Sequence, residues 1–393
     1  MIDRLVLRIL GAGVAVGSLD VTFADGSKGA LTGSELGPKA TVRLIKAGSL
    51  RRVLWGGSNA MVEAYMAGEF EPDDLTEFLF FAALNQKHWA ERHPLLYALG
   101  RKMGTWLPAS NRTVAVDSMV DHYNLGNEFY EAWLDPSMTY SAARFSLAGT
   151  SDDLSLEDAQ QAKYARLAEM ADLQPGQSVL EIGTGWGGMA RYAASLGCNV
   201  TTLTIAEAQA RYAVDKNRVA ELDGMIDVQL LDYSKVEGQF DRVVSIEMIE
   251  SIDDSRWPDY FDTIARVLKP GGRAGLQVIL INDEFYDSYR TNEDFIRRYI
   301  FPGGMVPSPR VLKDLTSRSG LTWDTEERFG LDYARTLKEW QERFESAWLQ
   351  ITTLGFDETF RKMWKTYLSY CEAGFLAGRI DVTQFSLTRP ANI

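Results

Sequence analysis

Four glycines stand between an apolar run and a helical pattern near the middle of the chain. The stretch VLEIGTGWGG covers residues 179–188, and its glycines occupy positions 183, 185, 187 and 188. Glycine lets a backbone turn sharply and approach a neighbour closely. A glycine-rich turn that leaves a strand and opens a helix is typical of sheets that hold a ligand against a helix N-terminus. This feature therefore favours an α/β fold that binds a small molecule.

Strand and helix patterns alternate on both sides of this loop. Helices are expected over 156–173, 188–197, 206–222 and 259–268, and strands over 177–182, 199–205, 226–232, 240–248 and 273–281. Two further strands, 322–330 and 381–389, bracket long helical segments. Repeated strand–helix–strand units form parallel sheets with helices on both faces. The sequence thus predicts a doubly wound, Rossmann-like sheet.

The first part of the chain has a different pattern. Residues 18–33 alternate around an Asp-Gly pair, which is typical of a β-hairpin, and helical patterns flank the acidic turn EFEPDD. We therefore expect a smaller mixed domain over residues 1–105 and a second domain over 118–393, joined by a linker within 103–118.

Charge and composition exclude several classes of function. The net charge of −13 disfavours nucleic acid as a partner. Only three histidines (His88, His93 and His122) and two distant cysteines (Cys198 and Cys371) are present, so no metal site and no disulfide framework is expected. The apolar run at 78–84 is far too short to cross a bilayer. A cytoplasmic protein is the expectation.

The residues around the glycine loop distinguish two classes of ligand. A dinucleotide site needs an acidic residue at the end of the second strand to hold a ribose, but Thr204 and Gln209 stand there. The loop is also preceded by Glu181, which suits a cationic ligand better than a pyrophosphate. S-adenosylmethionine carries an ammonium and a sulfonium and no phosphate, so it is favoured over NAD.

Several stretches together resemble one enzyme family. They are HYNLGNEFYEAWLDPSMTYS at 122–141, SLEDAQQAKYARL, VLEIGTGWGG, LTIAEAQ, FDRVVSIEMIE and YIFPGGMVPS at 299–308, with EAYMAGEF in the N-terminal part. In combination they resemble the cyclopropane-fatty-acyl-phospholipid synthases, which are S-adenosylmethionine-dependent methyltransferases with a class I Rossmann-like fold. The resemblance extends to the C-terminal segments FGLDYARTLKEWQERFESAW and YLSYCEAGFLAGRIDVTQFSLTR.

The resemblance implies a cofactor site. The loop glycines would lie against the methionine part, the residues before 142 would close over it, and the ends of the next two strands would hold ribose and adenine. The implied residues are Tyr140, Ser141, Glu181, Gly183, Gly185, Gly187, Thr204, Gln209, Asp232 and Tyr233.

The resemblance also implies a catalytic site, and here the sequence departs from the family. A cis alkene that gains a methyl group becomes a carbocation, which must be shielded from water and lose a proton. The family holds a bicarbonate ion for this step with a Cys, a Glu, a His and a Tyr. Glu250 and Tyr333 match, but Ala142 replaces the cysteine and Gln277 replaces the histidine. Glu250, Tyr333 and Gln277 are therefore the expected catalytic residues.

Three outcomes of this departure stay open. Bicarbonate could still bind through Gln277 and Tyr333, or Glu250 could take the proton itself. The cation could also lose a proton from a neighbouring chain carbon, which gives a methyl- or methylene-branched chain instead of a cyclopropane. The last outcome is favoured, because deprotonation of the new methyl group is the step that the missing residues serve.

The expected function is transfer of a one-carbon unit to the cis double bond of an unsaturated phospholipid. The enzyme is expected to act peripherally at the inner membrane surface, with a lipid-facing lid over 285–301. A homodimer and a reductase partner are further expectations. The alternatives are an NAD-binding oxidoreductase and a non-catalytic lipid-binding protein that keeps the fold.

Overall fold

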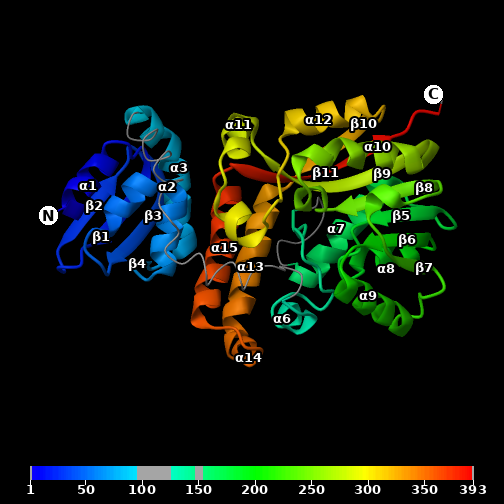
Figure 1. Ribbon diagram of the computed structural model, residues 1–393, viewed down its shortest axis with the longest axis horizontal. Helices are drawn as coiled ribbons and strands as arrows, with labels where there is room; N and C mark the ends of the chain where they lie inside the picture. The colour runs from blue at the N-terminus through cyan, green and yellow to red at the C-terminus, as the bar shows by residue number, and fades with distance from the viewer. Residues whose placement is uncertain (1, 95–124, 147–153, 392–393) are drawn as a thin grey trace. The chain divides into compact units, whose positions relative to one another are not determined.

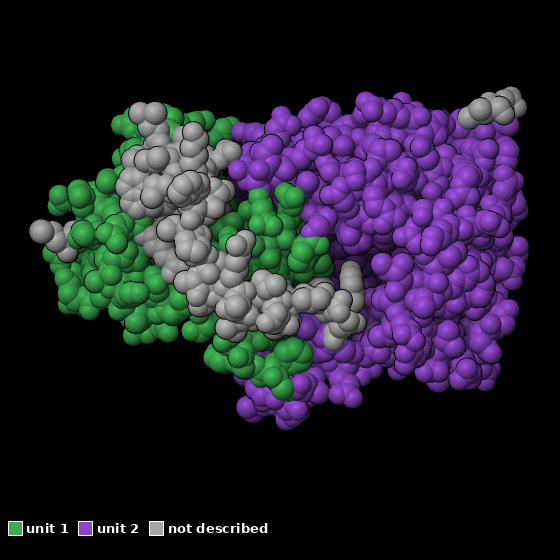
Figure 2. Space-filling view, in the orientation of Figure 1, with its two compact units in different colours: residues 1–120, 293–302, 355–377 green, residues 121–292, 303–354, 378–393 purple. Residues whose placement is uncertain are grey.

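The computed structural model describes residues 2–94, 125–146 and 154–391, so the expected linker at 103–118 and His122 lie outside the described residues. The chain divides into two compact units, which Figure 2 shows in different colours. Unit 1 comprises residues 1–120, 293–302 and 355–377, and unit 2 comprises 121–292, 303–354 and 378–393. The units are thus discontinuous in sequence, whereas the expected domains, 1–105 and 118–393, are continuous.

Unit 1 is built on a four-stranded sheet of order β2-β1-β3-β4. Its strands are β1 Val16–Thr22, β2 Lys28–Thr32, β3 Glu35–Leu44 and β4 Phe70–Pro72. β1 and β2 form the hairpin expected at the Asp-Gly pair, with Gly26 at φ +80° in the turn. Helices α2 Ser49–Met66 and α3 Leu75–Arg92 lie on the two sides of the acidic turn, as expected, and Asp74 caps α3. Helix α1 Ile2–Gly11 precedes the sheet.

Two later segments complete unit 1. They contain a π-helical turn, η5 Ile296–Ile300, and α15 Glu358–Leu376. Phe295 and Tyr299 are buried in this unit, and Tyr299 donates a 2.9 Å hydrogen bond to Glu63. In unit 2, Tyr286 is buried as well. The expectation of a lipid-facing lid over 285–301 is therefore wrong for these aromatic residues, which are core anchors.

Unit 2 contains a seven-stranded sheet of order β10-β11-β9-β8-β5-β6-β7 (Figure 1). The five strands from β7 to β9 are parallel, and β11 runs antiparallel to both β9 and β10. The strands are β5 Ser178–Ile182, β6 Asn199–Thr204, β7 Ile226–Leu230, β8 Phe240–Ile246, β9 Leu268–Ile281, β10 Thr322–Arg328 and β11 Ile380–Thr388.

Helices cover both faces of this sheet. One core includes α10 and α12 side chains such as Phe261 and Leu312, and the other includes Leu167 of α7 and Met189 of α8. The helices of unit 2 are α6 Asn127–Glu131, α7 Leu156–Ala171, α8 Gly188–Ser195, α9 Glu207–Val219, α10 Trp257–Val267, α11 Asp283–Thr291, α12 Pro309–Arg318, α13 Gly330–Ser346 and α14 Trp348–Thr352. Short 3-10 turns are η2 Tyr233–Lys235, η3 Ile249–Ser251 and η4 Asp254–Arg256.

The sheet topology indicates where a ligand can bind. From β5 the chain moves outward to β6 and β7, and it then returns to place β8 on the other side of β5. In doubly wound sheets such a switch point leaves a crevice at the carboxyl ends of the strands. The glycine loop follows β5, and residues 247–251 follow β8, so both segments lie at this edge of the sheet. No helix in the described part of the chain is long and apolar enough to cross a membrane.

Candidate active site

The glycine loop joins β5 to α8 and exposes its backbone. Gly183, Gly185 and Gly187 have φ values of +97°, +51° and +85°, a region that L-residues with side chains rarely adopt. A Cβ built on Gly185 would meet no atom within 4 Å, so the loop is open there. One built on Gly183 would lie 3.0 Å from Cγ of Met248. The loop therefore packs against the turn that follows β8 and leaves room for a ligand at Gly185.

Glu181 lies at the end of β5, beneath this loop. Its side chain is buried and accepts a hydrogen bond from the Thr202 hydroxyl, whose oxygen lies 2.7 Å from the hydroxyl oxygen of Thr184. Burial raises the pKa of Glu181 to about 8. A cationic ligand nearby would favour the charged carboxylate, because opposite charges lower the pKa of an acid.

The residues expected at the ribose lie together at the end of β6. Thr204 donates a 3.1 Å hydrogen bond to Oε1 of Gln209, and both side chains are largely buried. The next residue, Ile205, is 78% exposed. An exposed isoleucine at a ligand-binding edge offers an apolar face to an adenine ring. Sequence reasoning missed Ile205, because an isoleucine after a strand carries no distinguishing signal.

The two residues expected at the adenine have structural contacts. Asp232 caps η2 by accepting from the Ser234 N–H, and it pairs with Arg256 at 3.1 Å. Tyr233 is buried in the core, with its ring centroid 5.5 Å from that of Tyr260. Their contact with a cofactor stays a prediction.

Ser141 and Tyr140 belong to the segment before α7. Ser141 is buried; its hydroxyl accepts a 2.6 Å hydrogen bond from Nζ of Lys163, and its carbonyl accepts from Gln160 at 3.0 Å. The ring of Tyr140 lies 5.2 Å from that of Trp340 and 5.7 Å from that of Trp133. Tyr140 is therefore part of an aromatic wall, and Ser141 is fixed from α7.

The strongest convergence of polar groups lies on Glu247, immediately after β8. Its Oε1 accepts hydrogen bonds from the Ala142 N–H at 2.9 Å and from Nε2 of Gln277 at 2.7 Å. Its Oε2 accepts from the Tyr333 hydroxyl at 2.7 Å. Residues 142, 277 and 333 are the positions that the family resemblance assigned to a bicarbonate site. In this chain they surround a carboxylate of the protein itself.

Glu250, the carboxylate expected in this role, has other contacts. Its Oε1 accepts from the backbone N–H of Ile279, and its Oε2 has no hydrogen-bond partner among the described residues. The structure therefore brings Tyr333 and Gln277 together with Glu247 and not with Glu250. Burial raises the pKa of Glu250 to about 8, and the charge of Glu247 adds to the rise. Glu250 is therefore mostly protonated at neutral pH.

The position of Glu247 depends on an unusual backbone conformation. Its φ is +48°, and its N–H donates a 2.8 Å hydrogen bond to the Gln277 carbonyl. Helix α13 carries the donor Tyr333, and its Thr336 accepts from the N–H of Ala143, the residue next to the donor Ala142, at 3.1 Å. The only sequence signal was a second glutamate three positions before Glu250, and no pattern in the sequence predicts a positive φ there.

Burial and charge act in opposite directions on Glu247. Burial raises the pKa of this carboxyl, while the charge of Lys163 and the three hydrogen-bond donors lower it. Lys163 is fully buried, and burial lowers its pKa to about 7, although the negative charges of Glu247 and Asp135 act to raise it. A carboxylate with a raised pKa is a stronger base than an ordinary one, and such a group suits proton removal near neutral pH.

An aromatic wall adjoins this carboxylate. The Tyr333 ring meets that of Trp340 edge-on at 6.2 Å, and Trp340 lies 5.7 Å from Trp133. Trp340 and Phe344 are fully buried, as expected for a helix face that packs in the core. Aromatic faces favour a nearby cation by about 0.5–2 kcal/mol each. The site thus combines a buried carboxylate with a polarisable, largely apolar surface.

Comparison with known proteins decides the family. The family model of mycolic acid cyclopropane synthetase matches residues 110–385. The chain belongs to this family. It is similar to tuberculostearic acid methyltransferase UfaA1 of Mycobacterium tuberculosis, with 36% identity over 86% of this chain and 81% of that protein. It is also similar to cyclopropane-fatty-acyl-phospholipid synthase of Escherichia coli, with 33% identity over 89% of this chain and 88% of that protein.

A solved structure supports the same assignment. Mycolic acid cyclopropane synthase CmaA1 complexed with SAH and CTAB has a TM-score of 0.63 and 30% identity, and the match covers 68% of this chain and 95% of that chain. The chain is an S-adenosylmethionine-dependent methyltransferase of the cyclopropane synthetase family with a class I Rossmann-like fold, as expected. The open backbone at Gly185 fits this cofactor. Neither an NAD-dependent oxidoreductase nor a non-catalytic protein is favoured.

Proposed function

We propose that the enzyme transfers a methyl group to the cis double bond of an unsaturated phospholipid acyl chain, and that Glu247 removes the proton that the product must lose. The product is a methyl-branched chain that keeps a double bond; a methylene branch would form only if a hydride shift first moved the cation to the methyl-bearing carbon, so that the proton left the new methyl group. The observation that carries the proposal is the convergence of Ala142, Gln277 and Tyr333 on the Glu247 carboxylate.

The residues of the chain have separate roles in this proposal. When bound, S-adenosylmethionine supplies an electrophilic methyl group. Gly183, Gly185 and Gly187 approach the cofactor through their backbone, with Glu181 beneath the loop. Ser141, held by Lys163, fixes the adjoining segment. Tyr140, Thr204, Gln209, Asp232 and Tyr233 complete the predicted cofactor site.

The proton balance assigns the role of Glu247. An alkene carbon that uses its π electrons to bond a methyl group leaves its neighbour as a carbocation. Loss of one proton to Glu247 returns the C–H electron pair to the chain and restores a double bond beside the branch. A hydride donor of a separate reductase would then be needed to saturate that double bond. The proton on Glu247 would pass to water when the product leaves.

Glu247 also makes a separate anion unnecessary. A bicarbonate ion at the same donors would place two negative charges in contact, which low-dielectric surroundings make costly. We therefore propose that the reaction needs no added bicarbonate. Branching rather than ring closure is supported by the departures at Ala142 and Gln277, and by the similarity to a relative that is named a methyltransferase.

The phospholipid substrate is supported by the similarity to a phospholipid-acting relative and by unit 1. In this unit α1 exposes Ile2 at 52% and Leu5 at 60%, and the exposed Arg8 lies on the same helix. A short amphipathic helix with exposed apolar and basic side chains suits the surface of an anionic bilayer. Peripheral binding to the inner membrane surface and homodimerisation stay predictions.

Product analysis tests the proposal. The wild-type enzyme and Glu247→Gln are assayed with S-adenosylmethionine and vesicles of an unsaturated phospholipid, with and without bicarbonate, and the acyl chains are examined by mass spectrometry and NMR. We expect a gain of one methyl branch, no cyclopropyl signals and no bicarbonate dependence for the wild type, and at least about 100-fold lower activity for the variant.

Controls separate the parts of this proposal. Glu221→Gln changes an exposed carboxylate and should leave activity unchanged. Cofactor affinity, measured by calorimetry, should be the same for Glu247→Gln and wild type. Full activity of Glu247→Gln would exclude Glu247 as the base. Turnover of free fatty acids or acyl thioesters in preference to phospholipid vesicles would overturn the substrate class.

A further inference from the structure

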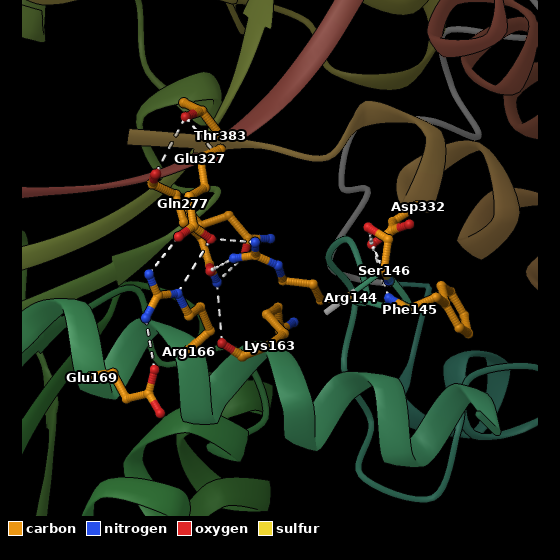
Figure 3. A network of polar contacts seen from close by, with 11 residues as sticks. Arg144, Phe145, Ser146, Lys163, Arg166, Glu169, Gln277, Glu327, Asp332 and Thr383 are labelled. Atoms are coloured by element: carbon orange, nitrogen blue, oxygen red, sulfur yellow. Dashed lines mark hydrogen bonds and ion pairs between the residues drawn. The ribbon is translucent and has the colours of Figure 1, made fainter. Parts of the chain in front are cut away.

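From Gln277 a series of hydrogen-bonded side chains leads to Arg144 and Glu327, which Figure 3 shows together with Gln277. Gln277 of β9 and Gln384 of β11 are register partners across the antiparallel pair, so their side chains share one face of the sheet. Nε2 of Gln384 donates to Oε1 of Gln277 at 3.0 Å. Oε1 of Gln384 in turn accepts from Nη1 of Arg144 at 2.7 Å. All three side chains are at most 5% exposed.

The far end of this series is fixed by charge. Arg144 also donates to Glu327 of β10, and Glu327 accepts in addition from Arg166 of α7. The Arg144 guanidinium lies 4.8 Å from the centroid of the Phe329 ring. Arg166 reaches the surface, where it pairs with Glu169 at 2.7 Å. Arg144 is therefore held by the Glu327 carboxylate and the Phe329 ring, and Arg166 fixes the position of that carboxylate.

Only one assignment of donors and acceptors is possible along the hydrogen bonds that join Arg144, Gln384 and Gln277. Arginine has donors and no acceptor, so the atom of Gln384 that faces Arg144 must be its carbonyl oxygen. The amide nitrogen of Gln384 then faces Gln277 and the Lys163 carbonyl, to which it donates at 3.1 Å. Gln277 must consequently turn its own oxygen toward Gln384. Its nitrogen then donates to Glu247 at 2.7 Å and to the Ala142 carbonyl at 3.4 Å.

We infer that Gln384 and Arg144 are positioning residues that fix the polarity of the Gln277 amide, so that Gln277 always presents a donor to Glu247. Gln384 contacts Gln277 directly, and Arg144 acts on Gln277 through Gln384. The inference rests on the proposed role of Glu247 as the base. An amide has nearly the same shape in its two orientations, so packing alone does not select one of them. The hydrogen bonds that run from Arg144 through Gln384 to Gln277 do select one orientation of the Gln277 amide.

Fixed polarity has a consequence for proton removal. A donor at Gln277 stabilises the anionic form of Glu247, whereas the oxygen of a reversed amide would favour the protonated form. The other groups that face Glu247 are Lys163 of α7, Tyr333 of α13, the neighbouring Glu250 and the Ala142 N–H. Because a change at residue 384 removes none of these groups, its effect on Glu247 can be measured separately.

The test uses two substitutions at the same position. In Gln384→Glu, the ion pair with Arg144 keeps the new carboxylate charged, and this acceptor draws the N–H of Gln277 away from Glu247. Gln384→Met has a similar shape and removes both polar ends, so it leaves Gln277 free to keep its donor on Glu247. The rate of methyl transfer is measured from pH 5.5 to 9.5 on full-length protein with saturating S-adenosylmethionine and phospholipid vesicles.

We expect Gln384→Glu to move the rising limb of the pH–rate profile upward by about one unit or more, because a one-unit shift corresponds to a tenfold change in the ionisation equilibrium. The rate at pH 7 should fall about tenfold, with KM for the lipid and Kd for the cofactor unchanged. Gln384→Met should move the limb by less than half as much. Asn217→Asp, which also turns a buried carboxamide on α9 into a carboxylate, should leave the limb in place.

Each result has a defined meaning. A parallel loss of rate at every pH, or an equal shift for Gln384→Glu and Gln384→Met, would overturn the inference. If Glu247→Gln is inactive and the Gln384→Glu profile is unshifted, only the inference fails. If Glu247→Gln is fully active, the proposed function fails.

A second measurement does not depend on the folding of a residue-384 variant. The side-chain amide signal of Gln277 in 15N-labelled wild-type protein is assigned by its loss in Gln277→Met. We expect this signal to titrate with the same midpoint as the rate, because its N–H donates to Glu247. A signal that does not move with pH would show that the nitrogen faces elsewhere and would overturn the inference.

Discussion

The hydroxyl of Tyr333, on helix α13, donates a 2.7 Å hydrogen bond to Oε2 of Glu247, which precedes it by 86 residues in the sequence. This contact joins α13 to the turn after β8 and leaves Oε1 of the same carboxylate to Ala142 and Gln277. The Glu247 carboxylate, its donors and the aromatic side chains of α13 are therefore parts of one arrangement.

Replacement of Tyr333 by phenylalanine should weaken the base without removing the ring. A hydrogen bond to a charged group contributes about 1.5–3 kcal/mol, so the rate at pH 7 should fall by about 10- to 100-fold. Loss of the donor also raises the pKa of Glu247 further, and the rising limb of the pH–rate profile should move to higher pH. Tyr192→Phe on α8 is the matched control. A Tyr333→Phe enzyme with an unchanged profile would exclude this role of the hydroxyl.

Replacement of Lys163 by methionine should affect two steps. The buried ammonium supports the anion at Glu247 and holds Ser141 at 2.6 Å. Its loss should move the rising limb of the pH–rate profile upward by roughly one pH unit. It should also raise the Kd for S-adenosylmethionine by roughly tenfold. Isothermal titration measures the second effect separately. If the pH–rate profile shifts but cofactor affinity does not, Lys163 acts on Glu247 alone.

Most of the fold could be predicted from the sequence because its strands are short, buried and regularly spaced. The expected strand at 177–182 is β5, Ser178–Ile182, and those at 322–330 and 381–389 are β10 and β11. The segments 293–302 and 355–377 join unit 1 in the structure, although they lie far along the chain. Long-range assignments of this kind depend on tertiary packing and leave no local signal.

The candidate site was predicted in part, and the missing part has a physical cause. Tyr333 and Gln277 were expected together, but Glu250 was chosen as their partner. The side chain that they bind belongs to Glu247, whose direction follows from a φ of +48°. Gln384 was missed as well, because only the register of β9 and β11 brings it to Gln277.

The raised pKa of Glu250 makes the stability of the protein depend on pH. The folded protein keeps a proton on this carboxyl to about pH 8, whereas the unfolded chain releases it near 4.5. Stability should therefore fall as pH rises between these values, by up to about 1.4 kcal/mol per pH unit for one group. Glu250→Gln removes this contribution, so its melting temperature should exceed that of the wild type by more at pH 8 than at pH 6. An equal difference at both values would contradict the assignment. Glu181 and Glu247 titrate in the same direction and remain in the variant.

The identity of the base should decide which product forms, and three positions allow this to be tested. Ala142→Cys with Gln277→His restores the side chains that the family resemblance associates with bicarbonate, but Glu247 would still fill their anion site. This double variant should therefore keep making a branched product. Adding Glu247→Gly empties the site, and the positive φ of this residue is favourable for glycine. The triple variant should require bicarbonate and yield cyclopropyl signals in the NMR spectrum of its lipids. Ring formation by the double variant would show that the carboxylate of Glu247 does not exclude bicarbonate, and it would remove the reason for assigning proton removal to this residue.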